Sequence, residues 1–352
     1  MNWKTTIISL AFMSPLFVLL YVSCVPHLGS KPTRVIVEIG QLHTTFQAYK
    51  ERAEAYPPCL ADVDPVERKL RFMKHLAAAY PNAEFEESTS AFDRLNDQVQ
   101  NGQDGGQGYN FVSATGGQAF PLDLNRLDAA EAIVFWLGGF PTPVRTTSLL
   151  PVANRRIFGF HRDADAPFRR DALAAEGLDA LRYRTEPMYQ FDETRLVDYD
   201  GDGWWEYASH SLRGDDLVPP IVYFDSETYV TSSKHADNVG LIRYPNGGSL
   251  GSRWGCAAPY LKTFDPQNPL AATWINPEGF QLQTGGDDQK YSLPMALHRS
   301  ERRVLTFPDG EKFGSLDGKP FERLEVDAEE QDNLSNTSNL SYGAAVKEFR
   351  SK

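Results

Sequence analysis

The sequence has only three cysteines among its 352 residues, Cys24, Cys59 and Cys256. So few cysteines exclude a small fold held together by many disulfides. Cys24 stands at the end of an apolar run, which leaves Cys59 and Cys256 to form a structural disulfide if the globular part of the chain is exported. Two unrelated thiols are an equal alternative, and both possibilities stay open at this point.

The chain also lacks the common local motifs of catalysis and nucleotide binding. Its seven histidines are scattered, without H-E-x-x-H or H-x-H spacing, and there is no C-x-x-C pair. No G-x-S-x-G elbow, phosphate-binding loop or dinucleotide fingerprint is present. We therefore expect a protein that is not an enzyme, with an exported enzyme of unknown reaction as the weaker alternative.

Positive charge is scarce as well. The 35 Lys and Arg residues are outnumbered by 47 Asp and Glu residues, which gives a net charge of −12. A nucleic-acid partner requires clustered Lys and Arg, so the composition argues against nucleic-acid binding. Hydrophobic residues make up 41% of the chain, enough for one large domain or two ordinary ones.

One feature that the chain does have is an uncharged apolar run from Ile7 to Val25. As a helix it would cover about 28 Å, close to the ~30 Å of a bilayer core. A cleaved signal peptide fits poorly, because the following Y-V-S-C-V-P-H-L-G-S offers no A-x-A site. A lipoprotein signal at Cys24 fits poorly too, because Tyr21 stands where leucine is usual. An uncleaved transmembrane anchor over residues 1–27 is therefore the favoured prediction.

An amphipathic helix pattern follows the apolar run. Its apolar residues recur at alternating steps of four and three, which keeps them on one stripe of a helix. These residues are Val35, Ile39, Leu42, Phe46, Tyr49, Ala53 and Tyr56. Charged residues such as Glu38, Lys50 and Glu51 lie largely off the stripe. The pattern predicts an amphipathic stem helix and connector over residues 28–60 that hold a globular head at the membrane.

Residues 61–325 are predicted to form that head, with helices first and strands after them. Helices are expected over Asp64–Tyr80, capped by Asp64, over Asp123–Gly138 and near Arg169–Glu176. Strands are expected over Arg156–Phe160, Met188–Leu196, Trp204–Ser209, Ile221–Phe224, Phe280–Gln283 and Arg303–Phe307. This order predicts an α+β fold: a long N-terminal helix packed on a mainly antiparallel sheet with large loop insertions. The polar, acidic residues 326–352 are predicted to be disordered.

The sharpest local pattern is L-V-D-Y-D-G-D-G-W-W-E-Y. Asp198, Asp200 and Asp202 alternate, and Glu206 follows them. Carboxylates this close repel one another unless a cation lies between them, and the glycines let alternate oxygens converge. An EF-hand is rejected, because Ser209 stands where its bidentate glutamate would be and the flanks look like strands. We predict a strand–loop–strand unit that is held together by a bound calcium ion. A plain acidic hairpin turn without a metal is the alternative.

The run E-I-G-Q-L-H-T-T-F-Q-A-Y-K-E-R-A-E-A-Y-P-P resembles the stem of type II secretion pseudopilins and related type IV pilins. In that family the pattern E-(I/L)-x-x-L-x-x-A-(L/I)-x-x-Y-x-x-x-x-G-x-Y-P leads from the stem into the head. The equivalent positions here are Glu38, Leu42, Phe46, Tyr49, Tyr56 and Pro57. The segments E-A-I-V-F-W-L-G-G-F-P, R-L-V-D-Y-D-G-D-G-W-W-E-Y and V-Y-F-D-S-E-T-Y are similar to enlarged pseudopilin-like proteins of planctomycete-type bacteria. The clear resemblance covers the first 58 residues and roughly Ile221 to Tyr291.

The resemblance implies a pilin-like head and a structural role as a subunit or accessory of a type II secretion pseudopilus. The chain would cross the bacterial inner membrane once, with its head in the periplasm. The stem, Val35–Tyr56, would mediate self-association or contacts with other pseudopilins. The segment N-P-E-G-F-Q-L-Q-T-G-G-D-D-Q-K-Y resembles the C-terminal strand and loop of the major pseudopilin, which implies that Asp287 is a calcium ligand. The alternative is an anchored, calcium-stabilised binding or scaffold protein that does not assemble.

Overall fold

The computed structural model describes a large part of the chain beyond the predicted anchor. The described residues are 31–62, 64–101, 110–111, 120–141, 157, 159–168, 185–210, 217–232, 238–245, 253–285, 289–291, 293, 300–316, 319–324 and 334–335. The predicted anchor and the predicted helix near Arg169–Glu176 lie outside these ranges. None of the helices within them combines the length and hydropathy that a membrane crossing needs.

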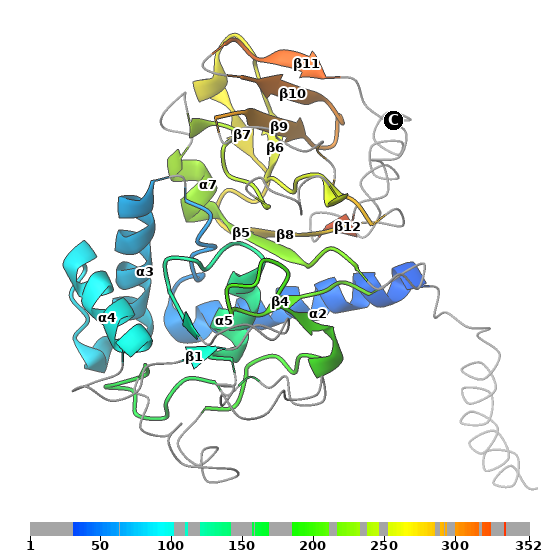
Figure 1. Ribbon diagram of the computed structural model, residues 1–352. Helices are drawn as coiled ribbons and strands as arrows, with labels where there is room; N and C mark the ends of the chain where they lie inside the picture. Colours follow the sequence, from blue (N-terminus) through cyan, green and yellow to red (C-terminus); the bar gives the residue numbers. More distant parts are fainter. Residues whose placement is uncertain are drawn as a thin grey trace, which may run out of the picture.

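The described residues form a mixed α and β fold (Figure 1). The α-helices are α2 (Lys31–Ala53), α3 (Pro65–Ala79), α4 (Thr89–Asn101), α5 (Glu131–Gly138) and α7 (Ser226–Ser232). The strands are β1 (Asn110–Phe111), β2 (Phe120–Pro121), β3 (Leu196–Val197), β4 (Glu206–Tyr207), β5 (Val222–Asp225), β6 (Tyr260–Thr263), β7 (Thr273–Trp274), β8 (Phe280–Thr284), β9 (Arg302–Thr306), β10 (Lys312–Ser315), β11 (Glu322–Leu324) and β12 (Leu334–Ser335). Short 3-10 helices are η1 (Pro81–Ala83), η5 (Glu193–Arg195) and η7 (Pro269–Ala271).

The strands form two larger sheets and two hairpins. One sheet has the order β11-β10-β9-β6-β7 and the other the order β12-β8-β5, while β1 pairs with β2 and β3 with β4. All these pairings are antiparallel except β6 with β9, which is parallel. Figure 1 shows the five-stranded sheet at the top, the three-stranded sheet below it, and α2 running beneath β5 and β8.

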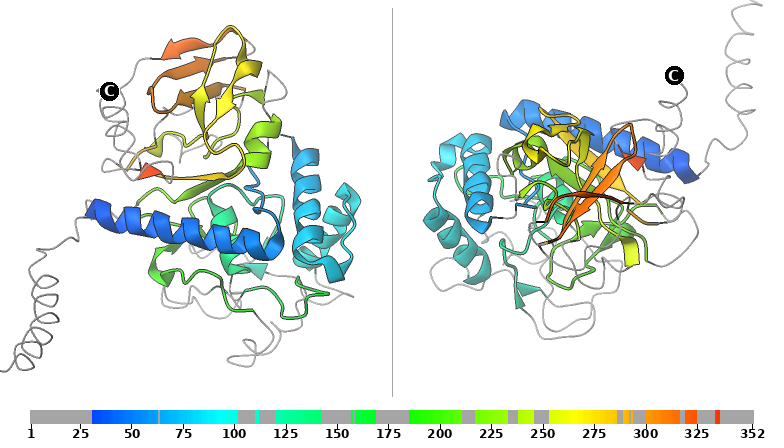
Figure 2. Two further views of the ribbon diagram at one scale, coloured as in Figure 1. Left: turned by 180° about the vertical axis from the view of Figure 1, so that it is seen from behind. Right: turned by 90° about the horizontal axis from the view of Figure 1, so that it is seen from above.

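The apolar stripe of α2 is buried against the rest of the chain. Val35, Ile39, Leu42, Phe46, Tyr49 and Ala53 are each at most 7% exposed, and Tyr56 is partly buried against the same core. The Phe46 ring stacks on Tyr223 of β5 with a centroid separation of 4.3 Å, and it lies 5.2 Å from Phe280 of β8. Both views in Figure 2 show α2 lying along the head. The stripe predicted from its spacing is therefore the surface on which this chain's own head packs.

The opposite face of α2 faces solvent. Its exposed residues are Arg34, Val37, Gly40, Gln41, Thr44, Gln47, Ala48, Glu51 and Arg52. A Cβ atom built on Gly40 would meet no atom within 4 Å. Contacts made by the Val35–Tyr56 stem with a second chain would have to use this exposed face, because the apolar stripe is already covered.

The connector after α2 is held by side chains of the head. The Tyr223 hydroxyl donates a hydrogen bond to the Pro57 carbonyl at 2.7 Å. The indole Nε1 of Trp136, in α5, donates to the Pro58 carbonyl at 2.9 Å. Because proline has no amide hydrogen, these carbonyls are the only backbone groups that the two prolines offer, and both are paired in the core.

Helix α3 begins as its sequence predicts. The Asp64 side chain accepts a hydrogen bond from the Val66 amide at 2.8 Å, and Pro65 fills the first helical position. Proline suits this position, because its missing amide would have no partner within the helix. The predicted start at Asp64 is confirmed.

Helix α5 begins later than predicted. The chain from Asp123 forms turns instead of a helix, because the Asp123 carboxylate accepts a hydrogen bond from the Asn125 amide. Asp128 and Glu131 form a reciprocal capping box: the Asp128 carboxylate accepts from the Glu131 amide, and the Glu131 carboxylate accepts from the Asp128 amide. The predicted end at Gly138 is confirmed, and Gly139 follows with φ of +96°.

Other predicted elements differ from the structure. Most of Met188–Leu196 is not strand, and β3 begins only at Leu196. In the tail predicted to be disordered, Leu334 and Ser335 form β12, which pairs with Thr284 and Gln283 of β8. Leu334 and Ser335 are the part of the tail that the structure describes, and their pairing with a sheet edge is not indicated by the polar composition of the tail.

Cys59 and Cys256, which the sequence left open as a possible disulfide, are not bonded to each other, and both side chains are buried. Cys59 belongs to the main core, where its amide donates to Asp225 at 2.7 Å. Cys256 belongs to a separate apolar cluster that includes Leu293 and Leu305. The alternative of two unrelated thiols therefore describes the structure, since each cysteine packs as a small apolar residue in its own cluster.

Replacing Phe46 with alanine should lower the free energy of unfolding by about 3–5 kcal/mol, because a fully buried ring would leave a cavity between α2 and the sheet. Urea unfolding followed by circular dichroism measures the change. The matched control is Gln41→Ala on the exposed face of α2, with an expected change within about 0.5 kcal/mol. Equal effects of the two substitutions would contradict the packing of the stripe on the sheet.

Candidate metal centre

The aspartate-rich segment forms the loop between two paired strands, as predicted. Leu196 pairs with Tyr207, and Val197 pairs with Glu206. Within the loop, one oxygen of Asp198 accepts hydrogen bonds from the amides of Gly201 and Asp202 at 2.8 and 3.0 Å. Gly201 has φ of +78°, a conformation that favours glycine, so the turn depends on this residue. Asp198 thus shapes the loop around it.

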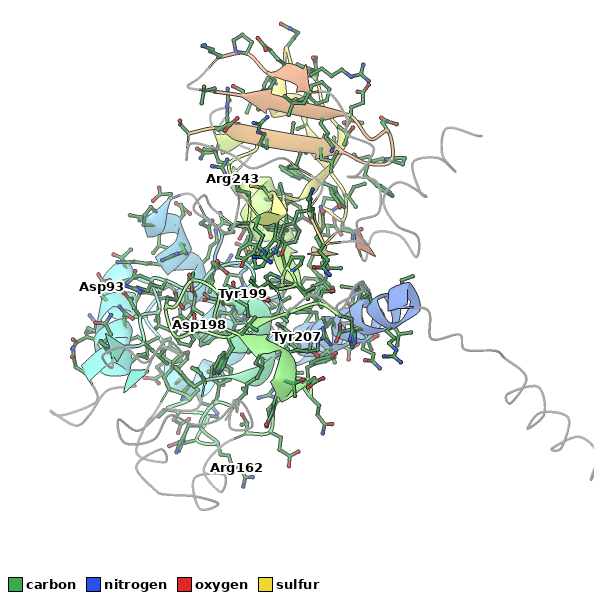
Figure 3. All side chains as sticks on the ribbon, turned by 45° about the vertical axis from the view of Figure 1, so that its right-hand side comes forward. Asp93, Arg162, Asp198, Tyr199, Tyr207 and Arg243 are labelled. Atoms are coloured by element: carbon green, nitrogen blue, oxygen red, sulfur yellow. The ribbon has the colours of Figure 1, made fainter. Side chains whose placement is uncertain are left out.

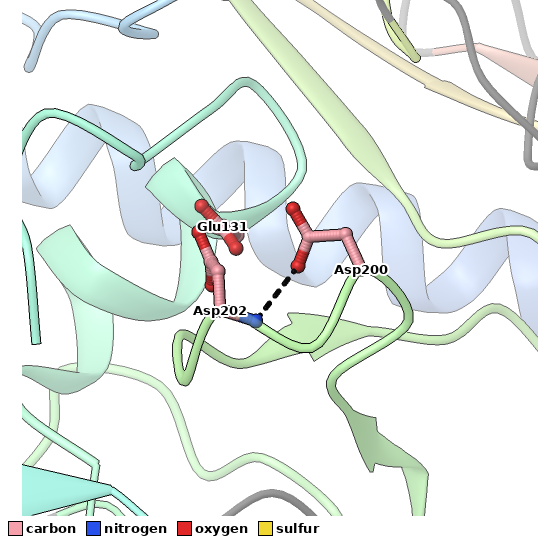
Figure 4. Close-up of side chains that lie close together, drawn as sticks. All are labelled: Glu131, Asp200 and Asp202. Atoms are coloured by element: carbon pink, nitrogen blue, oxygen red, sulfur yellow. Dashed lines mark hydrogen bonds between the residues drawn. The ribbon is translucent and has the colours of Figure 1, made fainter. Parts of the chain in front are cut away.

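Three carboxylates converge beside this loop. Glu131, Asp200 and Asp202 each offer one oxygen, and these oxygens all lie within 4.8 Å of one another. Figure 4 shows the carboxylate of Glu131, from the first turn of α5, facing those of Asp200 and Asp202 from the loop. Glu131 is 1% exposed and Asp202 is 4% exposed, whereas Asp200 is exposed. The cluster therefore lies at the border between the core and solvent.

The two buried members of the cluster are only half satisfied. One oxygen of Glu131 accepts from the Asp128 amide at 2.9 Å, and one oxygen of Asp202 accepts from the Trp204 amide at 3.0 Å. The other oxygens, Oε1 of Glu131 and Oδ2 of Asp202, have no hydrogen-bond partner among the described residues. Burying an unpaired carboxylate oxygen is costly, so these atoms require a specific explanation.

Burial and mutual repulsion oppose the ionisation of these groups. Burial raises the pKa of Glu131 well above its usual value, and the charges of Asp202 and Asp128 raise it further. Burial and the charge of Asp200 likewise raise the pKa of Asp202. Burial and Asp200 also raise the pKa of Asp198 to about 6. The cluster thus concentrates negative charge where water cannot fully solvate it.

The nearby Arg68 does not neutralise this charge by pairing with it. Its charge lowers the pKa of Asp128. Its hydrogen bonds, however, go to the backbone carbonyls of Asn125 and Leu127. The guanidinium is therefore fixed on the turn before α5, and the converging carboxylates face one another.

The structure brings together only part of the set of metal ligands predicted from the sequence. Glu206, a predicted ligand, uses both oxygens elsewhere: one accepts from the Tyr244 hydroxyl and the other from the Tyr199 amide at 2.8 Å. Asp198, also predicted, organises the turn and is not among the converging groups. Asp200 and Asp202 do converge, together with a residue that the sequence did not single out, Glu131.

The remaining predicted ligand, Asp287, lies outside the described residues. The sequence contained one local pattern that involves Glu131: the D-x-x-E spacing of Asp128 and Glu131 is typical of a capping box. That pattern predicts a helix start, but it does not predict that the same carboxylate meets the distant aspartate loop.

A mostly buried ion pair fixes the other end of the β3–β4 hairpin to α2. Arg195 holds both oxygens of Glu38 through its two terminal nitrogens, at 2.5 and 2.8 Å. The Tyr207 hydroxyl donates to the same carboxylate at 2.9 Å, and Arg195 Nε donates to the Ala208 carbonyl at 2.9 Å. Glu38 is only 5% exposed, so its expected place off the buried side of α2 is wrong. A bidentate arginine–carboxylate ion pair of this kind is among the stronger charged interactions in proteins.

The hairpin therefore lies centrally between helices. In Figure 3, the labelled Asp198, Tyr199 and Tyr207 lie in the middle of the molecule, whereas Asp93 and Arg162 lie at its periphery. One end of the hairpin is tied to α2 through Glu38 and Arg195, and the loop end meets α5 at the carboxylate cluster.

Comparisons of the chain with protein-family models, curated proteins and solved structures find no match. A functional assignment must therefore come from the residues and their geometry. The two features that carry information are the packed stem with its ion pair and the half-satisfied carboxylate cluster.

The cluster predicts an unusual pH dependence when divalent cations are removed. A raised carboxylate pKa stabilises the folded state fully below the unfolded-state value near 4, and this contribution is lost as pH rises through the folded-state pKa, about 6 for Asp198. The melting temperature in chelator should therefore fall between pH 5 and 8. Asp202→Asn should reduce this fall, because the amide has no charge to repel its neighbours. A wild-type curve parallel to that of the variant would contradict the prediction.

Removing one partner of the Glu38–Arg195 pair should cost about 3–5 kcal/mol of stability, because a buried charge is left without its counterion. Glu38→Leu and Arg195→Leu test this separately in urea unfolding. The double variant Glu38→Leu/Arg195→Leu should cost clearly less than the sum of the single changes. Additive costs would show that the two residues are not energetically coupled.

Proposed function

We propose that this chain is a membrane-anchored, pseudopilin-like structural protein, a subunit or accessory of a type II secretion pseudopilus. The observation that carries the proposal is the burial of one face of α2 against an antiparallel sheet. The stripe residue Phe46 packs on Tyr223 and Phe280, which lie on neighbouring strands of that sheet. A stem helix laid on an antiparallel sheet is the arrangement that the family resemblance implies.

The direction of α2 supports the same proposal. Its first residue, Lys31, follows the uncharged run that ends at Val25 by only a few residues. Figure 2 shows this N-terminal end at the edge of the molecule, away from α3 and α4. An anchor that precedes Lys31 would therefore extend away from this edge of the molecule. With one crossing of the bacterial inner membrane, the head would then lie on the periplasmic side.

The exposed face of α2 is the part of the stem that suits contacts between chains. Gly40, Thr44 and Ala48 recur every four residues on this face, so a second helix could approach closely. In the proposed pseudopilus, self-association or contact with other pseudopilins uses this face, while the apolar stripe holds the chain's own head. This division gives the two faces of one helix different tasks.

The alternative is an anchored, calcium-stabilised binding or scaffold protein that does not assemble. The carboxylate cluster favours it to this extent: a cation bound there would stabilise the head without any need for a filament. Both functions require the anchor, and they differ in whether neighbouring stems meet. Neither assigns a catalytic reaction to the chain.

Fractionation and cross-linking of the full-length protein test both parts of the proposal. The protein should remain with membranes after high-salt and carbonate washes, and a variant lacking residues 1–30 should not. In a Cys24→Ser background, Thr44→Cys on the exposed face of α2 should then give disulfide-linked dimers in membranes under oxidation, because the two native thiols of the head are buried.

The matched control is Lys74→Cys on the exposed part of α3, which should not give cross-linked dimers. Recovery of the full-length protein in the soluble fraction would overturn the anchor. Membrane association without cross-links at Thr44→Cys would overturn the assembling function and support the non-assembling alternative.

A further inference from the structure

We propose that Glu131, Asp200 and Asp202 bind one calcium ion, which ties the first turn of α5 to the β3–β4 loop. The site differs from the linear aspartate loop, because one of its ligands comes from a helix elsewhere in the chain, and it does not use Asp287. The inference is independent of the membrane-anchored role and can hold or fail separately.

The geometry of the oxygens suits one shared ion. Calcium binds oxygen at about 2.3–2.6 Å, so two oxygens on opposite sides of the ion lie about 5 Å apart. One oxygen from each of Glu131, Asp200 and Asp202 lies within 4.8 Å of the others. These separations are compatible with contact of all three carboxylates with one cation.

The unpaired oxygens give an independent reason to place a cation here. Oε1 of Glu131 and Oδ2 of Asp202 are buried and have no hydrogen-bond partner among the described residues, and both residues are more than nine-tenths buried. Their other oxygens accept from the amides of Asp128 and Trp204, which orient each carboxylate. Outer hydrogen bonds of this kind commonly hold metal ligands in place.

The chemistry of the three groups selects the class of cation. The site offers carboxylate oxygens and no sulfur or imidazole nitrogen, which favours a hard cation over zinc or copper. Magnesium usually takes one or two protein carboxylates and keeps several waters, whereas calcium accepts more protein oxygens and an irregular geometry. The exposed side at Asp200 leaves room for water to complete the coordination of calcium.

The position of the site explains what the ion would do for the fold. The Trp204 ring, next to the loop, lies 5.4 Å edge-to-face from Phe135 of α5, and its indole donates to the Asp123 carbonyl at 2.9 Å. Loop and helix are thus already packed, but their carboxylates repel one another across the contact. A divalent cation converts that repulsion into a cross-link between two segments of the core.

Calorimetric titration of CaCl2 into the chelator-treated full-length protein, in neutral buffer with physiological salt, tests the site. We expect one calcium per chain and a higher melting temperature with calcium than with the same concentration of magnesium. Glu131→Gln and Asp200→Asn should each weaken calcium binding by about tenfold or more, because each removes a ligand charge. Asp200→Asn is the variant least able to disturb folding, since Asp200 is exposed.

Two controls separate this site from other acidic groups. Asp97→Asn, on the exposed surface of α4, should leave binding unchanged, and so should Asp287→Asn in the other predicted calcium loop. Circular dichroism of each variant confirms that it is folded. Loss of binding in Asp287→Asn with full binding in Asp200→Asn would overturn the proposed site, as would the absence of calcium binding in the wild type. An equal response to magnesium would overturn the choice of calcium.

Discussion

The burial of one face of α2 is the interaction on which the rest of the head depends. The stripe centred on Phe46 covers β5 and β8, and the connector that follows α2 is held by hydrogen bonds from Tyr223 and Trp136. Each fully buried apolar side chain in such a stripe contributes about 1.5–3 kcal/mol. Loss of this face would therefore expose the sheet and release the connector at the same time.

The β3–β4 hairpin shows two solutions to the problem of placing charge in a core. At one end, the Glu38 carboxylate accepts hydrogen bonds from Arg195 and Tyr207, and the Arg195 charge neutralises it within the protein. At the other end, Glu131 and Asp202 face each other with unpaired oxygens. The first arrangement is complete by itself. The second requires either bound protons or a cation, so the charge at the loop end of the hairpin depends on the solution conditions.

The elements that the sequence predicted well are those specified by neighbouring residues. The α2 stripe, the Asp64 cap and the position of the aspartate loop between two strands each follow from spacing over a few positions. The sequence did not predict the burial of Glu38, because its partner Arg195 lies 157 positions away. It also did not predict Glu131 as a cluster member, because a capping box explains that residue locally without any reference to the aspartate loop. Long-range pairing of polar groups leaves no periodic pattern in a sequence.

The short strand β12 has a consequence for how copies of this chain can meet. It occupies one edge of the three-stranded sheet at Gln283 and Thr284, and on β5 at the other edge the Tyr223 amide donates to the Ala129 carbonyl. A sheet edge with free backbone groups is a template for strand addition, and filling it removes that template. At Gln283, Thr284 and Tyr223 the backbone groups of this sheet are therefore already paired within the chain, so a strand from a second copy cannot add at these positions.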